Sequence, residues 1–295
     1  MPSLAELRKK IKGISSTRQI TKAMKMVAGA RFGRAGRQRG DALYYQTELE
    51  KVLFAFLSLA GPPHGKLARL YSITGAQGAA AAQGNVGVFV IAGDKGLCGD
   101  FNNAILREAD AFIKKNTGRV KVLFAVGRKS VDHYKNSTVK RKCEYQQFFN
   151  RFDAGMAETI GRELYKAYQE EDLTELVVVH SHFKSMIKQQ VSSPRLLPIE
   201  AIPPQGNAYR GMLCEPSDEE MMLNKLIPMY LTARLYAALR DSFTAELAAR
   251  MRAMDNATRN AGSLIDSITL EMNKVRQAVI TRELAEIIAT NEVVK

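Results

Sequence analysis

The stretch that decides the fold is LAARMRAMDNATRNAGSLIDSITLEMNKVRQAV, residues 247–279. Apolar or small side chains recur in it at alternating steps of four and three, the spacing of the a and d positions of a coiled coil. The positions that carry this pattern are Leu247, Met251, Met254, Thr258, Ala261, Ile265, Ile268, Met272, Val275 and Val279. Because the repeat is sustained over more than four heptads, the sequence predicts a long helix that packs along another helix.

The helix that contains this stretch is predicted to cover residues 217–289. Ser217 and Glu220 have the spacing of a capping box at its start, and Pro228 is expected to kink its early turns. A second long helix is predicted over residues 3–60, where apolar residues again recur at steps of three and four. They are Leu4, Leu7, Ile11, Ile14, Ile20, Met24, Val27, Leu49, Leu53, Phe56 and Ala60.

Between the two helices the pattern changes to alternating strands and helices. Strands are predicted over residues 86–92, 119–126 and 175–180, and helices over residues 102–116, 129–135 and 154–169. This alternation predicts a parallel or mixed sheet with helices on both faces. The predicted fold class is therefore α/β, a long antiparallel two-helix coiled coil from the N- and C-terminal helices with an inserted Rossmann-like α/β domain.

The expected organisation has four segments. They are an N-terminal coiled-coil helix (1–60), a linker with a Gly/Ala-rich loop (61–85), an α/β foot domain (86–207) and a C-terminal coiled-coil helix (208–295). The two helices are expected to run antiparallel because the first enters the inserted domain and the second leaves it. Residues 75–85, GAQGAAAAQGN, are of low complexity and predict a mobile loop.

The charge of the chain is concentrated at one end. The 295 residues carry a net charge of +13, and residues 1–40 hold eleven Lys or Arg but one acid, Glu6. Ten of the 13 excess positive charges therefore fall in this stretch. A block of one sign indicates a partner of the opposite sign, such as nucleic acid, anionic lipid or an acidic protein surface. A solvated helix face is the simpler alternative.

Composition excludes several classes of protein. A hydrophobic fraction of 46% and a charged fraction of 25% are typical of a folded, soluble chain. No apolar run approaches the roughly 20 residues of a membrane-spanning helix. The three cysteines, Cys98, Cys143 and Cys214, are far apart and form no C-x-x-C, so we predict neither a disulfide framework nor a zinc ribbon.

Motifs for nucleotide or metal chemistry are incomplete. The loop Gly93–Gly99 follows a strand but lacks the Lys-Ser/Thr pair and the G-x-G-x-x-G spacing of phosphate-binding loops. A tight turn that needs positive φ, with Cys98 buried, is the simpler interpretation. His180 and His182 would share one face of a strand, yet no third ligand stands near them in the sequence. We therefore predict no catalytic residues, no metal and no cofactor.

Three motifs, in this order, resemble those of the gamma subunit of F-type ATP synthase. They are Ile20–Ala28 (ITKAMKMVA), Asp94–Gly99 (DKGLCG) and Asn273–Glu283 (NKVRQAVITRE). The resemblance covers both helices and the inserted domain. It implies a non-catalytic rotary central-stalk subunit that transmits rotation of the membrane c-subunit ring to the catalytic ring of alpha and beta subunits. It also implies the epsilon subunit as a further partner.

The resemblance implies which residues contact these partners. An acidic loop of the beta subunits is expected to face the basic helix, and Arg276 and Gln277 resemble residues that hydrogen-bond a beta-subunit loop. Glu215 resembles a residue beside the c-ring. The set expected at the alpha/beta ring is Arg8, Lys9, Lys12, Arg18, Lys22, Met24, Lys25, Arg276, Gln277, Thr281, Glu283, Leu284, Ile287 and Ile288.

The end of the C-terminal helix predicts a contact of its own. This helix is longer than the N-terminal one, and its end carries an apolar stripe at Leu284, Ile287 and Ile288. Such a stripe needs a covering partner, so we expect an apolar sleeve formed by the alpha and beta subunits. A start without a transit peptide predicts a bacterial source, and hence a peripheral location on the cytoplasmic side of the inner membrane. A basic coiled-coil nucleic-acid-binding protein stays open as the alternative.

Overall fold

The computed structural model of the chain describes residues 3–60, 71–72, 84–146, 152–200 and 219–293. The helices are α1 (Leu4–Ala60), α3 (Phe101–Lys115), α4 (Arg128–His133), α5 (Ala154–Glu170) and α6 (Glu219–Val293). The strands are β1 (Tyr71–Ser72), β2 (Asn85–Ile91), β3 (Val120–Val126), β4 (Lys140–Tyr145), β5 (Leu173–Phe183), β6 (Gln189–Ser192), β7 (Arg195–Leu197) and β8 (Ile199–Glu200). Two compact units result, residues 1–30 with 250–295, and residues 31–249.

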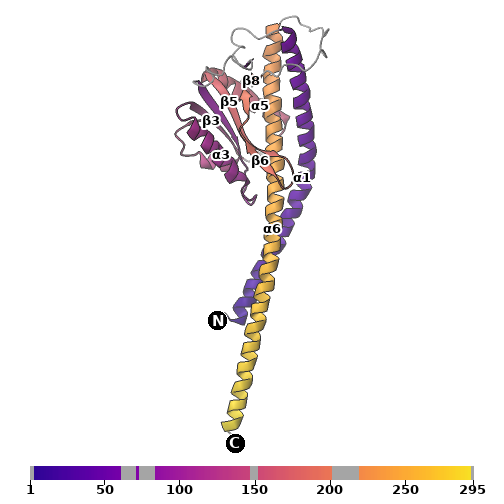
Figure 1. The fold of residues 1–295 in the computed structure, drawn as a ribbon, viewed down its shortest axis with the longest axis vertical. Helices are drawn as coiled ribbons and strands as arrows, with labels where there is room; N and C mark the ends of the chain where they lie inside the picture. The colour runs from indigo at the N-terminus through magenta and orange to yellow at the C-terminus, as the bar shows by residue number, and fades with distance from the viewer. Residues whose placement is uncertain (1–2, 61–70, 73–83, 147–151, 201–218, 294–295) are drawn as a thin grey trace. The chain divides into compact units, whose positions relative to one another are not determined.

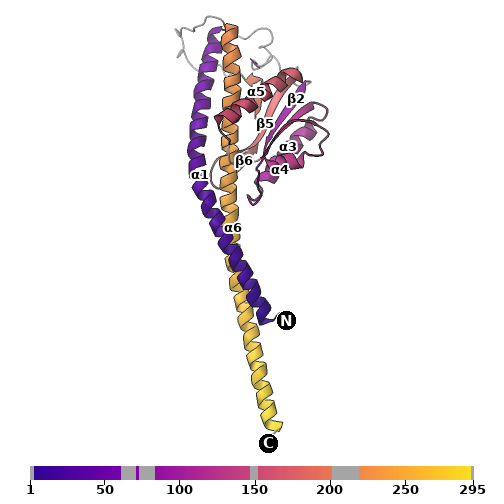
Figure 2. The same ribbon diagram turned by 180° about the vertical axis from the view of Figure 1, so that it is seen from behind.

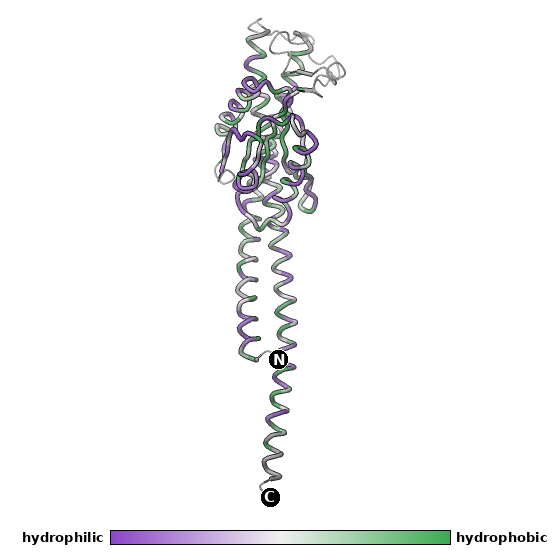
Figure 3. The backbone as a smooth tube through the Cα atoms, turned by 90° about the vertical axis from the view of Figure 1, so that its left-hand side faces the viewer, coloured by the Kyte–Doolittle hydropathy of each residue, from purple (hydrophilic) through white to green (hydrophobic). Residues whose placement is uncertain are grey.

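The first unit is an antiparallel pair formed by the start of α1 and the later part of α6. Lys25 Nζ lies 2.6 Å from Asp255 Oδ1, and Thr258 Oγ1 donates to Thr21 Oγ1 at 2.8 Å. Earlier residues of α1 therefore pair with later residues of α6, as the sequence predicted. The seam positions Met254, Ala261 and Ile268 of α6 are buried in this pair. Figure 3 shows hydrophobic residues recurring along both helices with hydrophilic ones between them.

The seam of α1 does not follow the predicted stripe. Ile20 and Val27 are 60% and 56% exposed, whereas the neighbouring Thr21 and Ala28 are buried. Thr21 and Ala28 continue the seven-residue step from Leu7, and their small side chains let the two backbones approach closely. Ile20 and Val27 of the predicted apolar stripe therefore lie outside the seam, and the smaller residues that follow each of them take the buried positions.

The second unit contains a five-strand path in the order β4-β3-β2-β5-β6, with β7 also paired to β5. Strands β4, β3, β2 and β5 are parallel, whereas β6 and β7 run antiparallel to β5. The parallel part has the strand order of one half of a Rossmann fold, so the predicted α/β class is confirmed. Strand β4, KRKCEY, was not predicted because charged residues typical of a sheet edge hide its strand pattern.

Helices cover both faces of this sheet, as Figures 1 and 2 show. Val86, Val88 and Val90 of β2 pack in one core with buried residues of α3 and α4. Phe89 and Ile91 point to the other face and pack with α5 and with the stretches of α1 and α6 that belong to the same unit. The alternation along β2 thus places one hydrophobic core on each side of the sheet.

The local features predicted at the start of the C-terminal helix and in the Gly/Ala-rich loop are only partly covered by the described residues. Helix α6 continues through Pro228. Ser217, at the predicted capping box, and residues 75–83 of the Gly/Ala-rich loop lie outside the described residues. The capping box that the structure does describe starts α1, where Glu6 N donates to Ser3 Oγ at 3.2 Å and Ser3 N to Glu6 Oε2 at 3.0 Å.

One glycine sets how closely α5 approaches α6. A Cβ at Gly161 would lie 2.6 Å from Thr232 Oγ1 and 3.4 Å from Thr232 Cα. Gly161→Ala is expected to lower the free energy of unfolding by about 1–2 kcal/mol, because overpacking outweighs the gain in helix propensity. Urea unfolding of the full chain, followed by circular dichroism, measures this. Gly155→Ala in the same helix is the control, since its nearest neighbour would be 3.5 Å away. Equal changes in the two variants would contradict the packing argument.

Candidate functional site

The described residues expected at the alpha/beta ring all lie in the first unit. Those on α1 with exposed side chains are Arg8, Lys9, Lys12, Arg18 and Lys22, whereas Met24 and Lys25 are half-buried. Those on α6 are Arg276, Gln277, Thr281, Glu283, Leu284 and Ile287, all exposed. Glu215 and the side chain of Ile288 lie outside the described residues. The structure thus places the candidates on two helical stretches, residues 8–25 and 276–287.

The ammonium group of Lys25 has a partner within the coiled coil. It pairs with Asp255, whose second carboxylate oxygen lies 3.4 Å from Arg259 Nη2. The hydrogen bond from Lys25 is the largest cause that holds the pKa of Asp255 below its ordinary value. Lys25 therefore helps to fix the register of the two helices, a role that its position in a basic run did not indicate.

Removing this ammonium group tests the pairing. Lys25→Met is expected to raise the pKa of Asp255 toward its ordinary value, with Arg259 preventing a complete return. An acid with a lowered folded-state pKa stabilises the fold above its unfolded pKa and loses that contribution as pH falls through the folded value. The variant should therefore lose less coiled-coil stability on acidification than the unmodified chain. An NMR titration of the Asp255 carboxyl measures the shift. The exposed Lys22→Met is the control and should leave this pKa unchanged.

An apolar face runs along the outer side of α1, opposite the seam. Ile20, Met26 and Val27 are more than half exposed, and Ala23 between them is exposed too. The exposed ammonium of Lys22 flanks this face. Apolar surface bordered by charge is typical of a site that binds another protein. This exposed face could have been predicted from the sequence. The seven-residue step that starts at Leu7 passes through Thr21 and Ala28 and leaves Ile20, Met26 and Val27 outside the seam.

A second apolar stripe lies near the end of α6. Ile280, Leu284 and Ile287 are 44%, 55% and 62% exposed and follow helical steps of four and three. The pairing of Lys25 with Asp255 places the first residues of α1 beside Arg276, because both helices rise equally per residue. Past Gln277, no described residue of α1 is therefore available to cover α6. Ile280 also belongs to this stripe, whereas the predicted stripe began at Leu284.

The glycine loop after β2 is held by side chains of its own domain. Gly93 N donates to Asn102 Oδ1 at 2.8 Å, and Asn102 Nδ2 donates to Lys95 O at 3.2 Å. The predicted turn with positive φ is confirmed, at Leu97 and Gly99, and Cys98 is buried. Asp100 is the N-cap residue of α3, although its carboxylate makes no capping hydrogen bond and pairs with Arg107 instead. A negative charge there opposes binding of a phosphate at that helix end.

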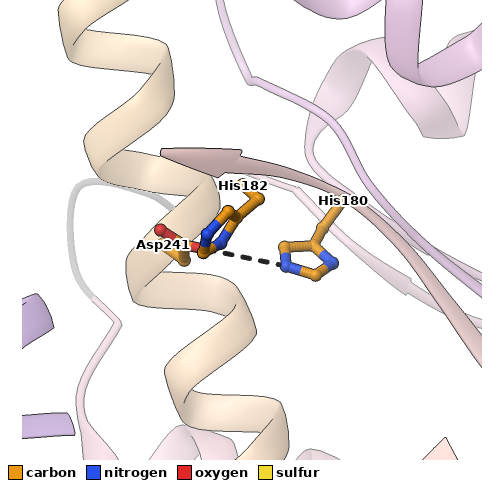
Figure 4. A group of neighbouring side chains, drawn as sticks. All are labelled: His180, His182 and Asp241. Carbon is orange, nitrogen blue, oxygen red and sulfur yellow. Dashed lines mark hydrogen bonds and ion pairs between the residues drawn. The ribbon is translucent and has the colours of Figure 1, made fainter. Parts of the chain in front are cut away.

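The two histidines of β5 do share a face, and the structure adds a third group to them. Asp241 of α6 lies against His180 and His182 (Figure 4). Arg39 Nε lies 2.6 Å from Asp241 Oδ1. Burial alone would raise the pKa of Asp241, but His180 and the charged Arg39 lower it to about 2. Asp241 is separated from His182 by 59 residues, so no spacing in the sequence indicates this cluster.

Comparison with known proteins identifies the family. The family described as ATP synthase matches residues 3–294. The gamma chain of ATP synthase from Solibacter usitatus is 34% identical over 298 residues, which cover 98% of each chain. The gamma chain from Moorella thermoacetica is 34% identical over 295 residues and covers all of both chains. This chain belongs to the ATP synthase gamma-chain family.

Solved structures of the same fold come from mitochondrial ATP synthases. The chain is similar to one in the central stalk and c-ring of Tetrahymena thermophila, with a TM-score of 0.59, 23% identity and coverage of 81% and 99% of the two chains. A chain of the Euglena gracilis enzyme in rotational state 3 has a TM-score of 0.65, 16% identity and coverage of 97% and 93%. None of the described helices has the length and apolar character needed to cross a membrane.

Proposed function

We propose that this chain is the rotary central-stalk subunit of a proton-translocating F-type ATP synthase. In this role it transmits rotation of the c-ring to the alpha/beta catalytic ring and so drives ATP synthesis, or hydrolysis in reverse. The observation that carries the proposal is the match to bacterial gamma chains at 34% identity over the whole length. The proposed partners are the alpha, beta and epsilon subunits and the c-ring. The similar solved chains belong to assemblies described as a central stalk, a rotor and a c-ring, and this supports the proposed set.

The geometry of the first unit suits such a role because its faces differ. One side of α1 offers exposed apolar and basic residues, and the end of α6 offers an apolar stripe without a covering segment from the described part of α1. Each rotor angle would therefore present a different surface to a given catalytic subunit. A catalytic subunit would shift toward the conformation that binds best to the face that the rotor presents at that angle. The difference in binding free energy between the conformations of the catalytic subunit would couple rotation to catalysis.

The same proposal assigns no bond chemistry to this chain and no cofactor. The residues that make and break phosphate bonds would belong to the catalytic ring. The chain would be peripheral, on the cytoplasmic side of a bacterial inner membrane, and the bacterial sources of its relatives support this location. The comparisons give no support to the alternative of a nucleic-acid-binding protein.

Reconstitution tests the proposal. The full chain is expressed with the alpha and beta subunits of its own source, and the complex is immobilised through the ring. A probe on Lys188→Cys, an exposed position after β5, should rotate in one direction when ATP is added. A chain that does not assemble with the ring, but binds DNA tightly at 50 mM salt and weakly at 200 mM, would favour the nucleic-acid alternative.

A further inference from the structure

His180, His182 and Asp241 form a cluster at the interface of strand β5 and helix α6, within residues 31–249. The two histidines are two residues apart on β5, so their side chains leave the same face of the sheet. Asp241 is almost completely buried, with 3% of its side chain exposed, and His180 is buried as well. Figure 4 shows the imidazole of His180 directed toward the carboxylate.

We propose that these three side chains bind a divalent transition metal ion, for which Zn²⁺ is the best match. Two imidazoles and one carboxylate form a ligand set that Zn²⁺ accepts, with a fourth position left for water. One ligand atom from each residue lies within 4.8 Å of those of the other two. His180 Nε2 is 3.8 Å from Asp241 Oδ2, and His182 Nδ1 is hydrogen-bonded to the same oxygen.

The second oxygen of Asp241 accepts hydrogen bonds from the surrounding protein, as the ligating carboxylates of metal sites commonly do. Arg39 Nε donates to Asp241 Oδ1 at 2.6 Å, and the backbone N–H of Phe183 donates to the same atom at 3.1 Å. Arg39 in turn donates to Phe183 O and lies over the Phe183 ring. These contacts orient the carboxylate so that Oδ2 faces the imidazoles and can bind an ion through one oxygen.

Binding requires a small movement. Ligand atoms about 2.0–2.1 Å from a tetrahedral Zn²⁺ lie roughly 3.3 Å from one another. His180 Nε2 must therefore approach Asp241 Oδ2 by about 0.5 Å, whereas His182 Nδ1, which is hydrogen-bonded to that oxygen, must move away from it. The half-exposed His182 has the freedom to do so. The metal would replace the proton between His182 Nδ1 and Asp241 Oδ2, and that proton is released to solvent.

Two further features favour a ligand at this position. His180 Nδ1 is buried and has no hydrogen-bond partner among the residues that the structure describes. This nitrogen is not the one that faces Asp241, so His180 could coordinate an ion through Nε2 while Nδ1 binds a water, which would recover the free energy that a buried, unpaired polar atom costs. A cavity of about 180 Å³ adjoins the cluster and is lined by residues of α1, β5, β7 and α6 and by Pro194. This cavity leaves room for a water at the fourth coordination position. Because His182 is half-exposed, an ion can reach the cluster from solvent on that side.

The ion would connect the sheet to a long helix within the same unit. Two ligands belong to β5, the third to α6, and Arg39 of α1 supports the third. Because the metal binds the folded arrangement and not the unfolded chain, it would stabilise this unit by an amount that grows with the logarithm of the free metal concentration above the dissociation constant. The site does not depend on the proposed rotary function, since it needs no partner subunit.

The experiment uses the full chain with Cys143→Ser and Cys214→Ser, which removes two competing thiols. Isothermal titration with Zn²⁺ should give one ion per chain, and Co²⁺ should give the strong visible absorption of a four-coordinate site. His182→Gln should weaken Zn²⁺ binding at least 100-fold. His133→Gln is the matched control, because His133 forms a surface pair with Asp110, at 2.9 Å, and its loss should leave binding unchanged.

Folding and binding can be separated. His182 is half-exposed, so His182→Gln should keep the far-UV circular dichroism of the unmodified chain. Asp241→Asn preserves the shape of the third ligand while removing its charge, and it should also lose Zn²⁺ binding. The proposal fails if the unmodified cluster binds no Zn²⁺, or if a folded His182→Gln chain binds one ion as tightly as the His133→Gln control.

Discussion

Replacing Lys9, Lys12 and Lys22 together by glutamate is expected to weaken association with the alpha/beta ring by about 100-fold. These side chains are exposed on α1 and lie in the part of the chain that carries most of its net charge. An exposed ion pair contributes about 0.2–1 kcal/mol, and reversing a charge also adds repulsion. Three reversals therefore amount to about 3 kcal/mol if the facing surface of the beta subunits is acidic.

The change in charge must be separated from a general loss of stability. Lys129, Lys135 and Lys188 are exposed lysines of residues 31–249, so their joint replacement by glutamate makes the same change in net charge elsewhere. Association rates measured by surface plasmon resonance at several salt concentrations compare the two triple variants. The α1 variant should show the slower association and a weaker dependence on salt. Equal association of both variants with the ring would remove the basis for the proposed electrostatic contact.

Lys25 is left out of this triple substitution because of what the structure adds to the sequence. The position of Lys25 in a basic run predicts a positively charged surface. It does not predict that this lysine, and not a neighbouring one, forms an ion pair with Asp255, 230 residues away. That depends on the register of two helices, which the sequence pattern leaves free to shift by whole heptads. The pairs Lys25–Asp255 and Thr21–Thr258 settle the register, and a Lys25 substitution would mix coiled-coil stability with partner binding.

The same distinction explains which other predictions succeeded. The seam of α6 was predictable because its seven-residue repeat is strong and carried by many residues. The apolar stripe predicted in α1 does not coincide with its seam around Ile20, because the buried residues Thr21 and Ala28 are small and an apolar pattern does not single them out. Strand β4 was not predicted because a strand at the edge of a sheet does not need a run of apolar residues. The contact of Asp241 with His182 depends on the packing of α6 against the sheet, which only the tertiary structure reveals.

Replacing Leu284 and Ile287 together by glutamate is the second change with a large expected effect. Both side chains are more than half exposed on a stretch of α6 that no described residue of α1 covers. Burying a leucine or isoleucine stabilises an interface by up to about 1.5–3 kcal/mol, and two new carboxylates in an apolar sleeve would add a desolvation cost. The double variant should therefore weaken the assembled complex by about 100-fold or more, measured by its dissociation on dilution.

Leu264→Glu with Leu270→Glu is the matched control, because these leucines have similar exposure earlier in α6 but lie outside the set expected at the ring. The control should have the smaller effect on assembly.

Measurements of rotation distinguish the two roles that the apolar end of α6 could have, that of a bearing and that of a torque-transmitting contact. Apolar contacts are non-directional, so a sleeve around the tip supports the rotor at every angle without a set of hydrogen bonds that must break at each step. A chain truncated after Arg282 should therefore still rotate in those complexes that assemble, with lower torque and shorter lifetime. Complete loss of rotation in an assembled complex would show instead that the tip transmits the torque, and the angle-dependent contacts would then have to be sought beyond Arg282 and not at Arg276 and Gln277.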